Sequence, residues 1–367
     1  MTPAGLYIHV PFCKAKCPYC DFYSLPVEEE RLEQYTRTME ETIAEWGERC
    51  GARPFDTVYF GGGTPSLLGG KRIGRLIRAV QDHFTLRGPE ITLEANPDES
   101  FARSAGAFAQ AGVNRLSFGL QSAIPRELKL LRRRHTAGIA AEAVRAAQAA
   151  GIRNISLDLM LALPEQTEAD IARSVAFCRE LGATHVSAYL LKVEPGTAFY
   201  QRRETLGAPD DDRAAELYLF AVRQLGLAGY RQYEISSFAE NRACQSRHNL
   251  KYWNSEEYLG LGPAAHSFYG GRRFYWPRSL RGFLEGAAPV EDGPGGSFEE
   301  YMMLRLRLTE GLLEAAVKRR FGRGIPPEIY ENARKIPPEY VILAEKGIRL
   351  TASGFLVSNS ILAALLP

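Results

Sequence analysis

Three cysteines near the start of the chain have a spacing that suits a metal centre. Cys13, Cys17 and Cys20 are separated by three and two residues and follow a short apolar run. A structural zinc site usually has a fourth protein ligand, but position 22 is Phe22 and no Cys or His lies just beyond it. A [4Fe–4S] cluster held by three cysteines keeps one iron open for an exogenous ligand. The spacing favours such a cluster, with a three-ligand zinc site or a chance grouping as the alternatives.

Polar residues stand where several apolar runs end. These ends are the glycine run 61–63 with Thr64, then Glu94, Gln121 and Asp158. Parallel α/β sheets carry their chemistry at the carboxyl ends of their strands. Taken singly, a glycine triplet is usually a turn and an Asp at a strand end often caps a helix. Only a sheet that gathers these ends would make them one site.

Six short apolar runs that do not alternate with polar residues predict buried strands, each but the last followed by a helical pattern. Strands covered on both faces are typical of parallel sheets. Six βα units are fewer than the eight of a closed barrel. The pattern predicts a partial (β/α)6 barrel of the TIM type, with a helix at about 28–49 after the first strand. The predicted strands are 6–10, 57–60, 91–95, 113–119, 155–160 and 185–190.

Composition shifts predict the domain organisation. Residues 1–210 form the barrel, and 211–285, rich in glycine and aromatic residues after a first helix, extend it. Residues 286–297 are rich in Gly, Pro and Ala and predict a linker. The segment 298–367 shows helical patterns at 299–309, 312–321 and 326–346, then two short strands at 347–351 and 354–357, which predicts a winged-helix-like domain.

Length and charge exclude several classes of protein. The 367 residues suggest two or three domains. Lys plus Arg is 45 and Asp plus Glu is 43, a net charge of +2, which argues against binding nucleic acid or a membrane surface by bulk electrostatics. No run of about eighteen apolar residues is present, and no secretory signal is visible. Six cysteines are too sparse for a disulfide scaffold, so we expect a cytoplasmic protein.

The cysteine spacing and its flanks resemble a known family. Residues 13–20 match the CxxxCxxC motif of radical S-adenosylmethionine (SAM) proteins. The flanks 6–13 and 58–66 look like the group that contains the oxygen-independent coproporphyrinogen III oxidases. Phe22, where those oxidases carry a further cysteine, and the HNxxYW sequence at 248–253 are most similar to the heme-chaperone branch of that group. The resemblance implies the fold of the radical SAM class, with SAM bound to the open iron of a cluster held by Cys13, Cys17 and Cys20.

The resemblance also assigns the strand-end residues to SAM. Gly61, Gly62 and Gly63 would let the backbone approach the methionine amino group, and Glu94 would accept a hydrogen bond from it. Arg133, one of three consecutive arginines, would pair with the methionine carboxylate, which a guanidinium can do bidentately. Gln121 and Asp158 would form hydrogen bonds with the ribose hydroxyls. Tyr7 and Tyr19 would flank the cluster and the adenine, and Thr64 completes the implied set.

The family associates the HNxxYW sequence with heme. A neutral imidazole such as His248 can ligate heme iron, and Tyr252 and Trp253 can pack against a porphyrin face. Without the resemblance, a hydrogen-bonded structural histidine would be the preferred interpretation. His266 is a competing ligand. Cys244 could ligate heme as a thiolate, but a solitary cysteine more often packs as a small buried hydrophobe.

The resemblance implies a heme chaperone that delivers heme to apo-hemoproteins such as respiratory enzymes, membrane-associated clients among them. The alternative is an oxidase that uses a 5′-deoxyadenosyl radical to decarboxylate the propionates of coproporphyrinogen. The C-terminal region could also bind nucleic acid, but modest basic clustering at 318–323 gives that little support. The sequence departs from the family at Ala162, Glu165 and the pair Pro263 and Ala264, where glycine or Ala-Gly is usual.

Overall fold

The computed structural model describes residues 2–344 and 346–366. Its centre is a 12-stranded sheet in the order β14-β13-β12-β11-β1-β4-β5-β6-β7-β8-β10-β9. The six predicted strands are confirmed, and they are consecutive and parallel in this sheet. They are β1 (Ala4–Val10), β4 (Pro54–Gly62), β5 (Thr85–Ala95), β6 (Arg115–Gln121), β7 (Asn154–Leu161) and β8 (His185–Leu190).

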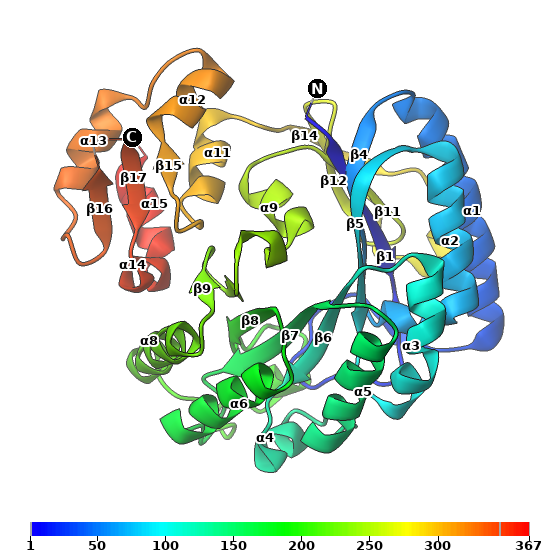
Figure 1. Ribbon diagram of the computed structural model, residues 1–367. Coiled ribbons are helices and arrows are strands. Elements are labelled where there is room, and N and C mark those ends of the chain that lie inside the picture. Colours follow the sequence, from blue (N-terminus) through cyan, green and yellow to red (C-terminus); the bar gives the residue numbers. More distant parts are fainter. Residues whose placement is uncertain (1, 345, 367) are drawn as a thin grey trace.

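Helices connect these strands and cover the outer face of the curved sheet (Figure 1). Apolar side chains on both faces of each strand explain the layering, because each strand must be covered on two sides. The predicted helix at 28–49 is confirmed as α1. The connecting helices are α1 (Glu29–Cys50), α2 (Gly69–His83), α3 (Glu99–Ala111), α4 (Pro125–Leu130), α5 (Ala137–Ala149) and α6 (Glu168–Glu180).

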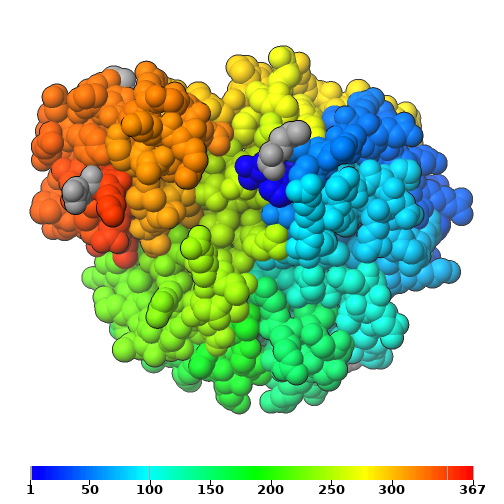
Figure 2. Space-filling view, turned by 45° about the horizontal axis from the view of Figure 1, so that its top comes forward, coloured from blue at the N-terminus to red at the C-terminus, as the bar shows by residue number. Residues whose placement is uncertain are grey.

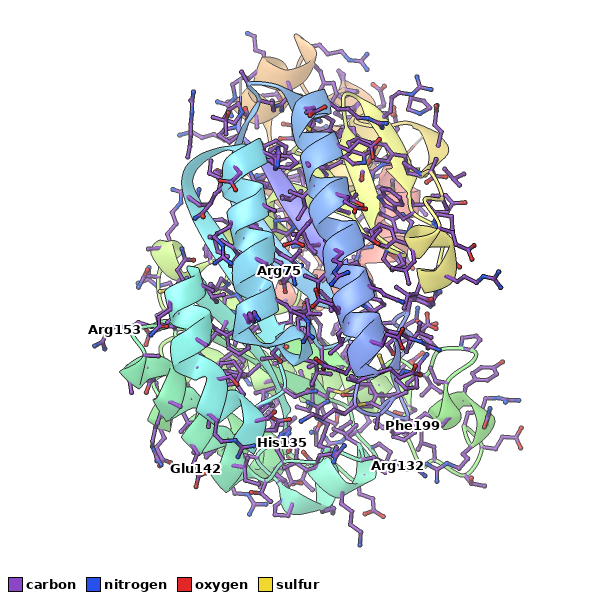
Figure 3. All side chains as sticks on the ribbon, turned by 90° about the vertical axis from the view of Figure 1, so that its right-hand side faces the viewer. Arg75, Arg132, His135, Glu142, Arg153 and Phe199 are labelled. Atoms are coloured by element: carbon purple, nitrogen blue, oxygen red, sulfur yellow. The ribbon has the colours of Figure 1, made fainter. Side chains whose placement is uncertain are left out.

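Charge pairs join the outer helices to one another. The guanidinium of Arg75 on α2 lies between the carboxylates of Glu33 and Glu40 on α1, and Figure 3 shows the two helices side by side with Arg75 labelled. Thr36 and Tyr35 on the opposite side of α1 are fully buried. The helix therefore packs its apolar side on the sheet and uses its charged side to hold its neighbour.

The sheet continues beyond the predicted strands on both sides. β11 (Tyr258–Leu261) adds to β1 in parallel, a member that the sequence pattern did not identify. The further strands are antiparallel: β12 (His266–Tyr269), β13 (Arg272–Tyr275) and β14 (Val290–Pro294) follow β11, and β10 (Ser237–Ala239) and β9 (Arg231–Gln232) follow β8. The fold is thus mixed α/β with a parallel core sheet.

The prediction that residues 286–297 form a linker is wrong for part of that range. Within 286–297, strand β14 pairs with β13 and so belongs to the edge of the sheet. The Gly and Pro residues there suit an edge strand, which needs hydrogen bonds on one side only. Smaller elements complete this part of the chain: β2 (Phe12–Cys13), β3 (Leu25–Pro26), α7 (Ala198–Gln201), α8 (Asp211–Leu227), α9 (Arg247–Trp253), α10 (Leu280–Leu284) and single 3₁₀ turns at Pro65–Leu68 and Arg242–Cys244.

The C-terminal segment has a separate apolar core that includes Met302, Leu312 and Ile348. A three-stranded antiparallel sheet in the order β15-β17-β16 packs among its helices. The elements are α11 (Phe298–Arg305), β15 (Leu312–Leu313), α12 (Glu314–Phe321), α13 (Pro327–Arg334), β16 (Val341–Ala344), β17 (Gly347–Leu350), α14 (Ala352–Leu356) and α15 (Ser358–Leu365).

Two predictions in this segment are wrong. The helix predicted over 326–346 ends at Arg334, because the residue before a proline resists helical geometry and Pro337 and Pro338 follow. The strand predicted at 354–357 is helix α14, which Thr351 caps by accepting a hydrogen bond from the Gly354 N–H at 2.9 Å. The predicted strand at 347–351 is confirmed as β17, but its partners are β16 and β15.

The C-terminal segment forms one side of the molecule. In the space-filling view its orange and red atoms lie beside the yellow-green segment that carries α9 (Figure 2). α11 contacts α9 directly. Among the described helices, none is both long and apolar enough to cross a membrane.

Candidate functional site

A cavity of about 450 Å³ lies at the carboxyl ends of the parallel strands. We call it the cysteine cavity, because the three cysteines of the motif line it. It brings together most of the residues predicted from the sequence. Those on its wall are Cys13, Cys17, Cys20, Tyr19, Gly62, Gly63, Thr64, Glu94, Gln121, Arg133 and Asp158.

The cysteine loop follows β1 and is held at both ends. The Leu25 N–H donates to Pro11 O at 2.7 Å, and the Phe199 N–H donates to Pro18 O at 2.8 Å. Phe199 is fully buried and lies next to the ring of Tyr19. Because these contacts bracket the loop, its thiols face the cavity.

The donor set fits an iron–sulfur cluster. Burial raises the pKa of the Cys20 thiol, and the neighbouring thiols Cys17 and Cys13 raise it further, so the three sulfurs are close enough to repel one another when charged. All three cysteines line the same cavity. A four-iron cluster takes each thiolate on a separate iron and keeps one iron open, whereas a structural zinc ion usually takes a fourth protein ligand.

The glycine run after β4 approaches the cysteine loop closely. Gly62 has φ 109°, and a Cβ there would lie 2.6 Å from the His9 ring. A Cβ on Gly63 would lie 2.6 Å from Phe12 O. Both positions therefore require glycine, and the Thr64 N–H donates to Phe12 O at 2.7 Å. The turn and the loop are one packed unit at the wall of the cavity.

Two half-buried carboxyl groups face the cavity from β5 and β7. Glu94 accepts hydrogen bonds from the Tyr59 hydroxyl (2.7 Å) and the Gly62 N–H (3.1 Å). Burial raises the pKa of Glu94 to about 7, and the charge of Asp158 adds to the rise. Burial also raises the pKa of Asp158 to about 6, although the Ser117 hydroxyl donates to it. A positive ligand group beside these carboxyls would favour their ionised forms.

Arg133 is the arginine of the 132–134 run that reaches the cavity. Its Nη2 donates to Asn96 Oδ1 (2.5 Å) and Gly119 O (2.6 Å), and its Nη1 lies 3.4 Å from Cys17 Sγ. Its neighbours Arg132 and Arg134 are exposed. The sequence alone gave Asn96 no role. Its place two residues after Glu94, at a strand end, was the signal that could have found it.

A second cavity of about 540 Å³ adjoins the first. We call it the aromatic cavity. It shares Glu94 and Tyr189 with the cysteine cavity. Tyr7 lies here and not on the wall of the cysteine cavity, although we expected it beside the cluster or the adenine. The other lining residues are Tyr59, Glu234, Ile235, Ser236, His248, Asn249, Tyr252, Trp253 and Arg307.

His248 is held on both sides within the aromatic cavity. Its Nδ1 lies 2.8 Å from Thr57 Oγ1 and its Nε2 lies 2.7 Å from the Tyr252 hydroxyl. Burial lowers the pKa of His248 to about 3, so the imidazole is neutral at physiological pH. A neutral imidazole can bind a metal, but Nε2 must first give up its bond to Tyr252.

The competing ligands lie elsewhere. His266 is exposed on β12 and its ring stacks on Tyr275. Cys244 lies in a 3₁₀ turn, and its carbonyl accepts a hydrogen bond from Arg115. Neither residue is on the wall of the aromatic cavity.

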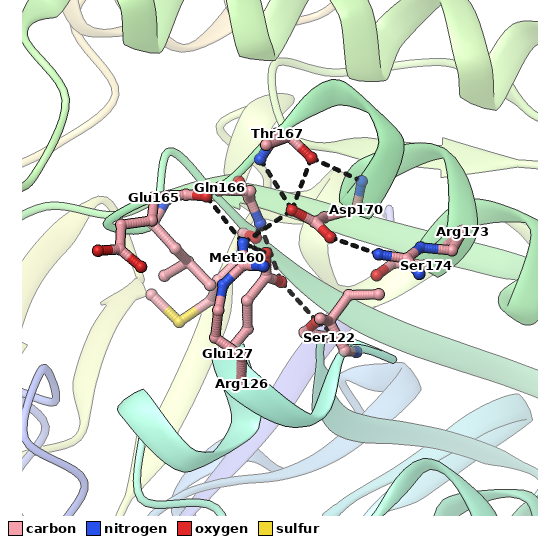
Figure 4. Close-up of polar contacts among 12 residues, drawn as sticks. Ser122, Arg126, Glu127, Met160, Glu165, Gln166, Thr167, Asp170, Arg173 and Ser174 are labelled. Atoms are coloured by element: carbon pink, nitrogen blue, oxygen red, sulfur yellow. Dashed lines mark hydrogen bonds and ion pairs between the residues drawn. The ribbon is translucent and has the colours of Figure 1, made fainter.

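The loop after β7 contains two of the departures from the family, and a buried network holds it (Figure 4). Ala162 and Glu165 have φ 59° and 58°, in the left-handed region that favours glycine. Gln166 donates to Glu127 and to Met160 O, and Arg126 donates to Glu165 O at 2.7 Å. These hydrogen bonds hold the turn although both residues carry a side chain. The turn follows the strand that carries Asp158.

Comparison with known proteins gives consistent relatives. A sequence model described as the radical SAM superfamily matches residues 7–178. A protein named heme chaperone HemW from Mycobacterium tuberculosis is 38% identical over 84% of this chain and 83% of its own length. Proteins of the same name from Bacillus subtilis (32% identical, 98% of both chains) and Escherichia coli (36% identical, 84% of both chains) are also similar.

A solved structure has the same fold. The E. coli coproporphyrinogen III oxidase HemN, described as a radical SAM enzyme, aligns with 99% of this chain and 90% of its own, with a TM-score of 0.83 and 21% sequence identity. At this identity the match concerns the arrangement of the elements. It covers the C-terminal segment as well as the parallel sheet.

Proposed function

Because this chain belongs to the HemW family of heme chaperones, whose members are radical SAM proteins, we propose that it binds heme and delivers it to apo-hemoproteins. The observation that supports this proposal most directly is the pair of adjoining cavities. One is lined by the cysteine motif and the other by the HNxxYW residues, and they share Glu94 and Tyr189. Two ligands could thus lie next to each other.

In this proposal the cysteine cavity holds a [4Fe–4S] cluster and SAM. Cys13, Cys17 and Cys20 would bind the cluster, which supplies an open iron for the amino acid part of SAM. Glu94 would accept a hydrogen bond from the SAM amino group, and Arg133 would pair with its carboxylate. The remaining residues would contact the methionine, ribose and adenine of SAM: Gly62, Gly63, Thr64, Tyr19, Gln121 and Asp158, with Gly61 next to Glu94 just behind the wall.

The aromatic cavity is the proposed heme site. Its volume lies in the usual range for small-molecule sites. The rings of Tyr7, Tyr59, Tyr252 and Trp253 line it, and aromatic rings pack well against a flat conjugated ligand. His248 is neutral and within this wall, so it is the candidate iron ligand. The Tyr252 side chain would have to turn away to free Nε2, because its oxygen lies 2.7 Å from that nitrogen.

The parallel strands would serve as the partial (β/α)6 barrel that the sequence predicts. The C-terminal segment, predicted as winged-helix-like, would serve as a contact surface for client proteins. The proposal does not need SAM cleavage. An oxidase would instead convert coproporphyrinogen when SAM and a reductant are present, and that assay separates the two functions.

The test is a hemin titration of the cluster-loaded protein under anaerobic conditions, followed by the Soret band. We expect a saturable complex with wild type and an affinity at least about tenfold weaker for His248→Ala. Tyr252→Phe should bind hemin at least as tightly as wild type, because Nε2 no longer has to break a hydrogen bond. His83→Ala, at an exposed position, is the control for surface ligation and should match wild type.

Either of two results would change the assignment. Wild-type affinity in His248→Ala would remove His248 as the iron ligand. No hemin complex with wild type would contradict the chaperone proposal, and conversion of coproporphyrinogen would then support the oxidase.

A further inference from the structure

The aromatic cavity contains one basic side chain among its described lining residues, Arg307. It comes from the C-terminal segment, 54 positions after Trp253 in the numbering and two positions after the end of α11. The other charged residues on the wall are Glu94 and Glu234. Among these lining residues Arg307 is therefore the one whose side chain can form an ion pair with an anionic group of a ligand that packs on the aromatic rings.

Backbone bonds fix where Arg307 stands. The Ile235 N–H donates to Arg307 O at 2.9 Å, and the Thr309 N–H donates to Tyr233 O at 3.0 Å. Leu306 and Leu308 on either side are buried. The segment is thus fastened to the wall of the aromatic cavity, and the half-buried Arg307 is held there by its neighbours.

The guanidinium of Arg307 has capacity left for a ligand. The structure gives it one side-chain partner, Asn359 Oδ1 at 3.2 Å from Nη2. Among the described residues, no carboxylate lies within ion-pair distance of it. Glu234, on the same wall, is 3% exposed and accepts a hydrogen bond from the Ser236 N–H. Burial raises the pKa of Glu234, and the charge of Arg307 offsets part of that rise. A guanidinium carries five donors in a planar fork, so most of them are open to a bidentate acceptor.

We propose that Arg307 binds a propionate carboxylate of heme and so orients the macrocycle in the aromatic cavity. This rests on the proposed function and names a specificity residue within it. The rings of Tyr252 and Trp253 would hold the porphyrin by a face that every porphyrin has. Arg307 would distinguish porphyrins that carry a free carboxylate on the edge facing the C-terminal segment. The C-terminal segment would then be part of the heme site and not only a contact surface.

The test compares hemin with hemin dimethyl ester, which has the same ring and iron but no carboxylates. Wild type should bind hemin about tenfold more tightly than the ester, as expected for a charge-assisted bidentate bond. Arg307→Gln should lose about that factor for hemin and keep its affinity for the ester within about twofold. Arg307→Lys should recover part of the hemin affinity, since it retains the charge without the fork.

Arg349→Gln is the matched control. It removes the same charge from an exposed position of β17 in the same segment, and it should bind both ligands as wild type does. Equal binding of hemin by Arg307→Gln and wild type would overturn the proposal. So would an equal loss for hemin and ester, which would indicate a structural role. If wild type binds neither ligand, the proposed function itself fails, and that outcome is distinct from the other two.

Discussion

Glu94 is a half-buried carboxyl group whose hydrogen-bond partners, the Tyr59 hydroxyl and the Gly62 N–H, are both neutral. Burial without a cation raises its pKa to about 7. Near neutral pH the group is therefore divided between two forms, and only the ionised form is a strong acceptor for an amino group. The position of one proton on Glu94 would then control how well the proposed SAM site is formed.

We predict that SAM binding weakens as the pH falls through 7. Below that pH Glu94 carries a proton that the ligand must displace, so binding at pH 6 should be about tenfold weaker than at pH 7.5. Isothermal titration of cluster-loaded protein with SAM measures this. Glu94→Gln should bind more weakly at pH 7.5 and show almost no change between the two pH values.

Glu142→Gln is the control, because Glu142 is exposed on α5 and its loss should leave the pH dependence unchanged. A wild-type affinity that stays constant from pH 6 to 7.5 would show that Glu94 does not meet the ligand. The raised pKa of Asp158 acts in the same direction, and the variant separates the two carboxyls.

At the scale of the element, the turn between β11 and β12 shows what a departure from the family costs. Ala264 has φ 68°, and its N–H donates to Pro277 O while the Ala265 N–H donates to Gly262 O. The left-handed conformation is strained for any residue with a Cβ. These hydrogen bonds hold Ala264 in a strained backbone conformation. Glycine would adopt the same conformation without that strain energy.

We predict that Ala264→Gly stabilises the protein by about 0.5–1 kcal/mol, because relief of the strain exceeds the added entropy of the unfolded chain. The adjacent Ala265 is fully buried and has no positive φ. Ala265→Gly should therefore destabilise by about 1 kcal/mol. Urea unfolding measures both, and a destabilised Ala264→Gly would contradict the strain argument.

At the scale of the whole molecule, one buried arginine ties the C-terminal segment to the motif helix. Arg305 at the end of α11 is 5% exposed. It donates to Asn254 Oδ1 (2.5 Å) just after α9, to Gly311 O (3.1 Å) and to Glu310 Oε2 (2.6 Å). Since α9 carries His248, these bonds join the HNxxYW residues to the segment that supplies Arg307.

We predict that Arg305→Ala lowers the free energy of unfolding by about 2–3 kcal/mol, because it removes a buried side chain and leaves the buried Gly311 carbonyl and the half-buried Asn254 amide oxygen without their charged donor. It should also weaken hemin binding, since α9 loses its support. Unfolding by urea and the hemin titration are the two measurements. Arg349→Ala should stay within about 0.5 kcal/mol of wild type. Unchanged stability in Arg305→Ala would mean that the segment is held to α9 mainly by apolar contacts.

The sequence by itself determined the features that depend on a few neighbouring residues. Apolar runs predicted the six parallel strands, because a strand covered on two faces must be apolar throughout. The spacing of the cysteines predicted a shared centre, and the strand-end rule predicted that Glu94 and Asp158 meet. The resemblance chose Arg133 among three arginines, and the structure places its guanidinium at the cavity wall.

The tertiary structure decided everything that depends on chain segments meeting from far apart. The aromatic cavity combines β1, β4, α9 and the C-terminal segment, and no local pattern contains that combination. The tertiary structure also placed Tyr7 on the wall of this cavity, added β11 to the parallel strands and made β14 part of the sheet. The physical reason is that burial and backbone pairing are satisfied over the whole molecule. The pattern of a few neighbouring residues shows which side of a strand is apolar, but it does not show which distant residues will pack against that side.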